Sequence, residues 1–194
     1  MNAPRDTRST LDRNRLRRLI EAGRSVVAEH ELEGVFSRLL DVARELTGAK
    51  YAAIGILDEK RENLADFITA GIDPNAHGLI GDLPRGRGVL GLLISKPEPL
   101  RMPNVGAHIR SYGFPQGHPA MTSFLGVPIL IRREAWGNLY LTNKHAGDFD
   151  EADEEAAVVL ASWAAIAVEN ARLYRETDQR RAELELSVHA LEAT

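Results

Sequence analysis

The sequence predicts an α+β fold in which helices cover one face of an antiparallel β-sheet of five to six strands, with a long helix at the C-terminus. Apolar residues repeat with a helical period at both ends of the 194-residue chain, and short β-rich runs lie between these ends. The runs do not alternate regularly with helical patterns. A doubly wound parallel sheet needs such alternation, so the antiparallel arrangement is the better prediction.

Two amphipathic helices are predicted before the sheet. In residues 10–29 the apolar positions repeat at close to 3.6 residues, with arginines mostly between them. Residues 32–47 carry a second helical pattern, and Gly48 follows it in the usual place for a C-terminal cap.

The first part of the sheet is predicted as a hairpin. Residues 51–57 and 64–70 are apolar, β-rich runs, and a polar turn at 58–63 joins them. A short buried helix is expected at 89–94, where prolines stop it, and a short edge strand at 100–102.

A long irregular stretch precedes the last two predicted strands. Residues 103–122 contain three prolines, three glycines, two histidines and two aromatic residues. Irregular segments of this length in a small domain are often functional. Residues 123–132 and 137–142 then read as two strands that a tight turn at 133–136 connects.

The last 40 or so residues form one helical pattern, which begins near residue 151. Asp150 or Asp153 is expected to cap it. At 1.5 Å per residue such a helix is roughly 60 Å long, so its end must project from the domain. A 4-3 spacing runs from Trp163 through Ala167 and Tyr174 to Leu191. This spacing favours a dimeric coiled-coil connector, and a solvated terminal helix is the alternative.

Composition excludes several classes of function. The chain has no cysteine, which rules out disulfides, iron–sulfur clusters, cysteine-bound zinc, a thiol nucleophile and a thioether-linked cofactor. A net charge of −4 argues against a nucleic-acid-binding surface. The polar N-terminus lacks the apolar core of a signal peptide, and no uninterrupted apolar run approaches the length that spans a bilayer. We therefore expect a cytoplasmic protein without a membrane partner.

Signatures of common enzymes are missing as well. The sequence holds no GxSxG, Walker A or HExxH motif. Gly86, Gly88 and Gly91 formally fit a dinucleotide-binding GxGxxG pattern, but no clear parallel strand precedes them. These glycines are better explained as a tight entry to the short helix, and the chain is not expected to be an enzyme.

His118 is the most informative of the six histidines. Prolines on both sides restrict its loop, and nearby apolar surface comes from Phe114, Met121 and Phe124. A lone imidazole on a stiff, apolar-flanked loop is what an axial haem ligand requires. The alternative is a loop histidine whose ring nitrogens bond only to the backbone.

Tyr140 lies on the last predicted strand. Period-two alternation places it on one face together with Asn138 and Thr142. If the ring points inward, its hydroxyl is placed to donate a hydrogen bond to a bound diatomic ligand. The alternative is a half-buried aromatic residue of the kind common in strands.

Several motifs in order resemble a GAF domain, between about Leu32 and Tyr174. More narrowly, they resemble the first, haem-binding GAF domain of dormancy sensor histidine kinases of the DevS/DosT type. The motifs are Ala70-Gly71-Ile72-Asp73, Ile80-Gly81-Asp82-Leu83-Pro84, Gly86-Arg87-Gly88-Val89-Leu90-Gly91, Pro99-Leu100-Arg101, the His118 loop, Phe124-Leu125-Gly126-Val127-Pro128, Gly137-Asn138-Leu139-Tyr140-Leu141-Thr142 and Ala167-Val168-Glu169-Asn170-Ala171-Arg172-Leu173-Tyr174.

The resemblance implies roles for individual residues. His118 matches the proximal ligand of a non-covalently held haem b, and Tyr140 matches the distal tyrosine that hydrogen-bonds to bound gas. Phe67 matches an aromatic residue of the haem pocket. Gly55 matches a position where a carboxylate in one family member restricts access to the haem edge, so glycine favours gas sensing over redox sensing. One departure is Ala120, where the family has a second proline after the histidine.

The resemblance also implies an organisation. Residues 1–30 would be an N-terminal helix, 31–174 the GAF sensor domain and 175–194 a connector toward an output domain. The chain would be the sensory module of a two-component histidine kinase that binds oxygen, NO or CO, or that senses redox state. It would form a homodimer through its terminal helices and regulate a kinase domain in cis, although the chain itself has no kinase core. The alternative is a haem-free GAF domain that binds another small ligand or only dimerises.

Overall fold

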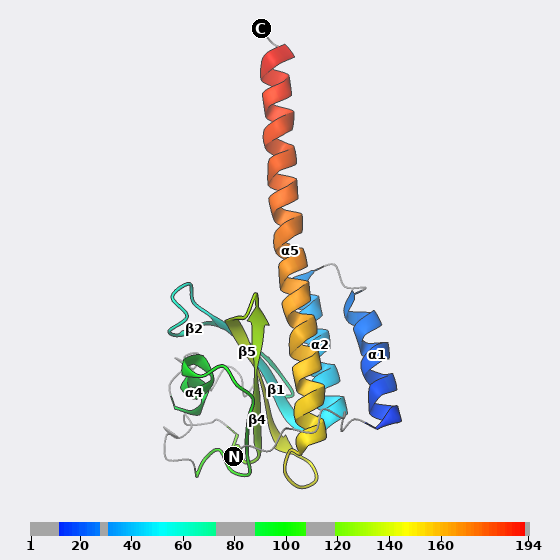
Figure 1. The fold of residues 1–194 in the computed structure, drawn as a ribbon, viewed down its shortest axis with the longest axis vertical. Coiled ribbons are helices and arrows are strands. Elements are labelled where there is room, and N and C mark those ends of the chain that lie inside the picture. Colours follow the sequence, from blue (N-terminus) through cyan, green and yellow to red (C-terminus); the bar gives the residue numbers. More distant parts are fainter. Residues whose placement is uncertain (1–11, 28–30, 73–87, 108–118, 193–194) are drawn as a thin grey trace, which may run out of the picture.

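The fold is seen in a computed structural model, which describes residues 12–27, 31–72, 88–107 and 119–192. For residues 175, 176 and 182–192 it describes the backbone alone. The described strands form one five-stranded antiparallel sheet with the order β2-β1-β5-β4-β3 (Figure 1). The predicted α+β fold is therefore confirmed. The strands are β1 (Ala49–Leu57), β2 (Leu64–Ala70), β3 (Leu100–Met102), β4 (Phe124–Ile131) and β5 (Glu134–Lys144).

Helices α2 (Leu32–Thr47) and the first part of α5 (Glu151–Glu192) cover one face of this sheet, as predicted, and α1 (Arg13–Val27) packs on the outer side of these two helices (Figure 1). The short helix α4 (Val89–Ser95) lies on the opposite face. Two separate apolar clusters result, one on each face of the sheet. Alternate residues of β5 divide between them, since Leu139 and Leu141 join the cluster under the helices and Tyr140 joins the cluster under α4.

Local chemistry accounts for the helix ends. Gly48 ends α2 with φ of +70°, a left-handed conformation that favours glycine, and its N–H donates to the carbonyl of Arg44. At the start of α5, the Asp150 carboxylate accepts a hydrogen bond from the Asp153 N–H over 2.9 Å. The Asp153 carboxylate accepts one from the Asp150 N–H over 3.0 Å. This reciprocal cap confirms that the two predicted residues both hold the helix end.

The turn between the last two strands is tighter than the sequence predicts. Arg132 and Arg133 have φ of +52° and +70°, and they form the two-residue connection between β4 and β5. Positive φ at both central residues matches the right-handed twist of a hairpin, but such turns usually contain asparagine or glycine. Two arginines give no such signal, so the turn was predicted at 133–136 and β5 begins three residues earlier than expected.

Helix α1 packs on the domain through Leu19, Ala22 and Val26, which are buried in the helix-side cluster. Its approach to α5 depends on Gly23, because a Cβ at this position would lie 2.9 Å from ring carbons of Trp163. The Trp163 ring therefore faces α1 of the same chain. The predicted 4-3 spacing begins at Trp163 and Ala167, and both pack partly buried against the helix-side cluster. The first turns of the 4-3 pattern therefore pack against residues of the same chain.

The C-terminal half of α5 projects beyond the body of the domain (Figure 1). The stretch Glu151–Arg181 of α5 is long enough, and its mean hydropathy high enough, to cross a membrane. Charged residues interrupt this stretch, so it contains no long apolar run. Ala156, Ala157 and Leu160 within it are fully buried against the sheet and α2. Packing in the core thus explains part of the apolar character of this helix.

Candidate ligand-binding site

The cluster under α4 is the candidate site because it joins residues from four strands and a helix around one tyrosine. Tyr140 on β5 is 3% exposed, and its ring centroid lies 5.9 Å from that of Phe67 and 6.2 Å from that of Phe124. The other members are apolar and come from β1, β3, α4 and the segments next to the strands: Ala53, Val89, Leu90, Leu92, Leu93, Leu100, Met102, Val105 and Met121.

Two glycines of the sheet make room for this arrangement. Gly55 on β1 lies opposite Asn138 of β5 and opposite Phe67 of β2. A Cβ on Gly55 would lie 2.8 Å from Leu64 Cδ2 and 3.0 Å from Tyr140 Cε2. On β4, a Cβ on Gly126 would lie 2.8 Å from Leu93 Cδ1 of α4. Glycine therefore gives Tyr140 and α4 the space that they occupy above the sheet.

Within this apolar cluster lie polar groups without partners. The Tyr140 hydroxyl and both polar atoms of the Asn138 side chain are buried and accept or donate no hydrogen bond in the part of the chain that the structure describes. Asn138 is 0% exposed. Burial raises the pKa of the Tyr140 phenol well above its ordinary value of 10. The Asn138 side chain lies close enough to the hydroxyl to oppose this rise in part, but the two groups do not meet the geometry of a hydrogen bond. The phenol is therefore a neutral hydrogen-bond donor at physiological pH.

Such groups are costly in an empty site. A buried polar atom without a partner loses its hydrogen bonds to water and gains nothing in return, at about 1–3 kcal/mol each. Native proteins pair the great majority of these atoms, so adjacent exceptions on one strand indicate a place where a ligand supplies the missing partner.

The segment after residue 118 is tied to the same strand. Asn143 donates from Nδ2 to the carbonyl of Ala120 over 2.8 Å and accepts from the N–H of Thr122, also over 2.8 Å. The hydroxyl of Thr142 donates to Sδ of Met121 over 3.0 Å. Strand β5 therefore carries both the unpartnered polar groups and the attachment of this segment.

The predicted site residues meet only in part. The structure brings Phe67, Tyr140, Phe124 and Met121 together in one cluster, with Gly55 directly beneath. His118 and Phe114 lie outside the described residues, so their predicted contact with this cluster stays a prediction. Alternation along β5 places Asn138 on the face of Tyr140, but the sequence gives no reason to name it as a site residue. The signal that could have found it is an amide between apolar residues on the buried face of a strand.

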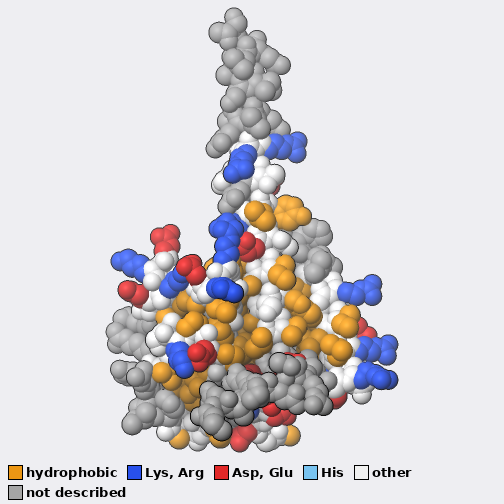
Figure 2. Space-filling view, in the orientation of Figure 1, with side chains coloured by type: hydrophobic (Ala, Val, Ile, Leu, Met, Phe, Trp, Pro, Cys, Tyr) orange, Lys and Arg blue, Asp and Glu red, His pale blue; other side chains and the backbone are white. Residues whose placement is uncertain are grey.

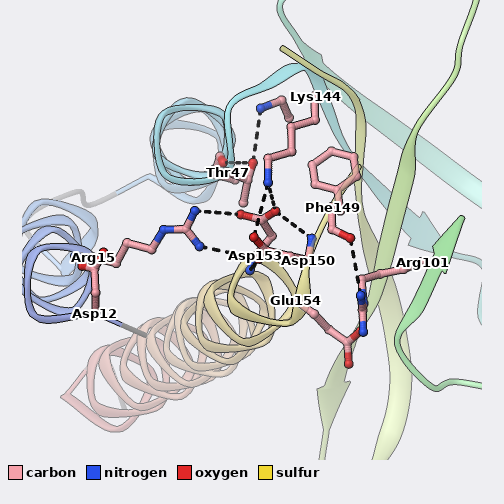
Figure 3. Close-up of polar contacts among 11 residues, drawn as sticks. Asp12, Arg15, Thr47, Arg101, Lys144, Phe149, Asp150, Asp153 and Glu154 are labelled. Atoms are coloured by element: carbon pink, nitrogen blue, oxygen red, sulfur yellow. Dashed lines mark hydrogen bonds and ion pairs between the residues drawn. The ribbon is translucent and has the colours of Figure 1, made fainter. Parts of the chain in front are cut away.

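A charged cluster joins the end of β5, the strand that carries Tyr140, to α1 and α5 (Figure 3). Asp153 of α5 is fully buried, and its carboxylate accepts a short hydrogen bond from Nζ of Lys144, the last residue of β5. Its Oδ1 lies 3.2 Å from Nη2 of Arg15 on α1, close enough for an ion pair but without the geometry of a hydrogen bond. One buried carboxylate thus contacts a cation from β5 and another from α1.

A groove between β3 and the start of α5 lies close to the charged cluster. Its volume is about 510 Å³, and acidic side chains and the Arg101–Glu154 ion pair line it. Arg101 Nε donates to Glu154 over 2.6 Å, so the charged groups at its centre already satisfy each other. The unpartnered groups around Tyr140 make the better candidate for a ligand site.

Comparison with known proteins decides the family. The family model described as a GAF domain matches residues 29–169, which is most of the chain. The chain belongs to the GAF domain family. The probable 3′,5′-cyclic phosphodiesterase pde-5 of Caenorhabditis elegans is 25% identical over 176 residues, which cover 84% of this chain. This match spans only 24% of the relative, so the chain corresponds to about a quarter of its length.

Solved structures share the fold. The GAF domain of a phosphoenolpyruvate-protein phosphotransferase from Coxiella burnetii superposes with a TM-score of 0.74 at 24% identity, covering 84% of this chain and 97% of that one. Free methionine-R-sulfoxide reductase from Neisseria meningitidis, in complex with its substrate, gives 0.67 at 19% identity, with coverage of 86% and 97%. A GAF domain assigned to a sensor histidine kinase of Pseudomonas syringae pv. tomato gives 0.59 at 18%, with coverage of 86% and 93%.

The family match places the chain among GAF domains, and the solved structures share its fold.

Proposed function

We propose that this chain is the cytoplasmic sensory GAF module of a two-component sensor histidine kinase, and that it binds haem b non-covalently to sense a diatomic gas (oxygen, NO or CO) or redox state. The observation that carries the proposal is the buried, unpartnered Tyr140 hydroxyl in an otherwise apolar cluster. The sequence resemblance to haem-binding GAF domains of the DevS/DosT type supports the same assignment.

The described side of the site fits the chemistry of haem. A porphyrin needs apolar and aromatic surface, and Phe67, Phe124 and Met121 provide it around Tyr140. When bound, haem supplies an iron that holds an axial histidine and a gas ligand. His118 would be the axial ligand, and Phe114 would add to the apolar wall. The neutral phenol of Tyr140 would donate a hydrogen bond to the gas.

Gly55 has a second role in this proposal. A side chain at residue 55 would press on Tyr140, Leu64 and Phe67, which together cover this end of the site. Glycine leaves these side chains free to part and admit a ligand to the buried hydroxyl. We therefore favour direct gas sensing over redox sensing. Rapid oxidation to ferric haem in air, with no stable oxygenated form, would contradict this choice.

The charged cluster offers a route from the site to the helices. Lys144 ends the strand that carries Tyr140, and its Nζ contacts the buried carboxylate of Asp153 at the start of α5. A shift of β5 on ligand binding would change this contact and the attached Arg15 of α1. Two states of the cluster would then bias the position of the helices and regulate an output domain in cis.

Reconstitution with hemin tests the haem assignment. The purified protein is expected to give a Soret band distinct from that of free hemin, and His118→Ala is expected to lose it. His145→Ala serves as the matched control, since His145 is exposed at the end of β5. A wild-type spectrum equal to that of free hemin would refute haem binding, and a normal spectrum for His118→Ala would refute the axial ligand.

A haem-free GAF domain that dimerises is the second candidate, and the surface of the helices favours it. Large apolar side chains are exposed on α5, namely Val158, Ile166, Leu173 and Tyr174. Leu16 and Ile20 are exposed one turn apart on α1. Figure 2 shows hydrophobic side chains gathered over the lower part of α5. A homodimer through the terminal helices would cover such side chains, whether or not haem is bound.

A further inference from the structure

We infer that Asn138 is a second ligand-recognition residue, and that its carboxamide acts with the Tyr140 hydroxyl to select ligands that accept hydrogen bonds over apolar ligands of the same size. The inference rests on the proposed ligand-binding function and deepens it. It starts from three buried polar atoms on one face of one strand, Asn138 Oδ1 and Nδ2 and Tyr140 Oη, none of which has a partner among the described residues.

The strand geometry brings these atoms together. Asn138 and Tyr140 are two residues apart on β5, so their side chains leave the same face of the sheet. Across the sheet Asn138 faces Gly55 on β1 and Pro128 on β4. Neither neighbour has a side chain that can donate or accept a hydrogen bond. Neither directly paired residue on the adjacent strands therefore offers the carboxamide a side-chain hydrogen bond.

Other polar residues of β5 have hydrogen-bond partners, unlike Asn138 and Tyr140. Thr142 lies on the same face and donates to Met121 Sδ, and Asn143 makes hydrogen bonds to Ala120 and Thr122. The polar residues at the C-terminal end of the strand are thus paired, and those under α4 are not. A structural asparagine in the same strand is paired on two sides, so Asn138 is not explained as a structural amide.

The donor set defines the class of ligand. The phenol offers one donor, and the carboxamide offers two N–H donors and one carbonyl acceptor. A ligand group with a polar accepting atom fits these donors. Of the gases considered above, oxygen accepts hydrogen bonds more strongly than carbon monoxide does when each is the bound ligand.

The first test uses the ligand-free protein. Asn138→Leu keeps the size of the side chain and removes the unpartnered amide. It should raise the midpoint of thermal unfolding by about 2–4 °C or more. Thr142→Val is the matched control, because it also removes a polar group from this face but one that has a partner. Its midpoint should stay level or fall. An equal or lower midpoint for Asn138→Leu would overturn the inference, since the amide would then cost the empty protein nothing.

The second test uses the hemin-reconstituted, reduced protein with oxygen and carbon monoxide as probes. Asn138→Leu should weaken oxygen binding relative to carbon monoxide by about 3- to 10-fold, the loss of one hydrogen bond. A ratio within twofold of the wild type would overturn the inference and leave haem binding intact. Failure of the wild type to take up hemin would refute the haem proposal instead, and the ligand-free unfolding test would then decide the inference.

Discussion

The ring of Tyr140 occupies space that glycine at residue 55 leaves open. A Cβ on Gly55 would lie 3.0 Å from Cε2 of Tyr140, closer than nearly all real contacts of a Cβ atom. The two residues belong to neighbouring strands, and Tyr140 pairs with Ala53 two positions away from Gly55. The lack of a side chain at one position and the bulk at the other are therefore parts of one packing arrangement.

Gly55→Ala should destabilise the protein by about 1–3 kcal/mol, because the new methyl group overlaps both Tyr140 and Leu64. Chemical denaturation of the two proteins measures the difference in the free energy of unfolding. The double variant Gly55→Ala/Leu64→Ala is the matched control, since it removes the nearer obstacle at 2.8 Å. If Gly55→Ala lowers the free energy of unfolding equally in the wild type and in Leu64→Ala, the cause is not steric overlap with Leu64.

Stability should fall with rising pH above about 10 because of Tyr140. Burial raises the pKa of its phenol in the folded state above the ordinary value of 10. Above that pH the unfolded chain loses the proton and the folded chain keeps it, so unfolding becomes more favourable by up to about 1.4 kcal/mol per pH unit. Below pH 10 the phenol is neutral in both states and the contribution is constant.

Denaturation series between pH 9 and pH 11 on the wild type and Tyr140→Phe measure this slope. The variant should lose the Tyr140 part of it. Tyr174→Phe, which removes a phenol that is 75% exposed, should keep the wild-type slope. The same slope in Tyr140→Phe as in the wild type would show that the phenol is not buried in solution.

Asp153→Asn should destabilise the protein by about 3–5 kcal/mol, because it leaves two cations beside a buried neutral amide. Lys144 and Arg15 have side chains only 13% and 21% exposed, so water replaces the lost carboxylate poorly. Glu21→Gln is the control, since it breaks the exposed Arg17–Glu21 pair, whose side chains are 80% and 63% exposed, and should cost under about 1 kcal/mol. If high salt removed the loss in Asp153→Asn, the carboxylate would not be buried.

Ile166→Glu should weaken dimerisation through the terminal helices, because it places a charge in the exposed apolar surface of α5. Sedimentation equilibrium should show a dissociation constant raised by tenfold or more, from a loss above about 1.4 kcal/mol. Leu130→Glu is the matched control. Leu130 is also an exposed apolar residue, but it lies on β4 next to the hairpin turn. A monomeric wild type, or equal effects of the two variants, would refute this interface.

Local patterns were enough to place most elements of the fold. The helical period of α2 and its glycine cap, the β-rich runs of β1 and β2, and the acidic cap of α5 all depend on residues close in the chain. The exception among the described turns is Arg132–Arg133, whose left-handed conformation has no local signal. There the pairing of β4 with β5 imposes a geometry that arginine alone does not prefer.

Part of the candidate site could likewise be predicted from local patterns, and part depends on contacts between distant strands. Alternation along β5 was sufficient to group Asn138, Tyr140 and Thr142 on one face. That Phe67, Phe124 and Gly55 meet Tyr140 depends on the order and register of four strands, which no local pattern specifies. The contacts of His118 and the identity of the ligand stay predictions that rest on the resemblance.

Patterns local in the chain were enough to predict the helices, the strands and the two faces of β5, and the lack of cysteine means that any haem is held without a thioether bond. That Trp163 faces α1, that Asp153 is buried between two cations and that Asn138 is buried without a partner among the described residues follows from the packing of the folded chain. Burial and hydrogen-bond satisfaction depend on the strands and helices that lie over a side chain, and these neighbours are distant in the chain.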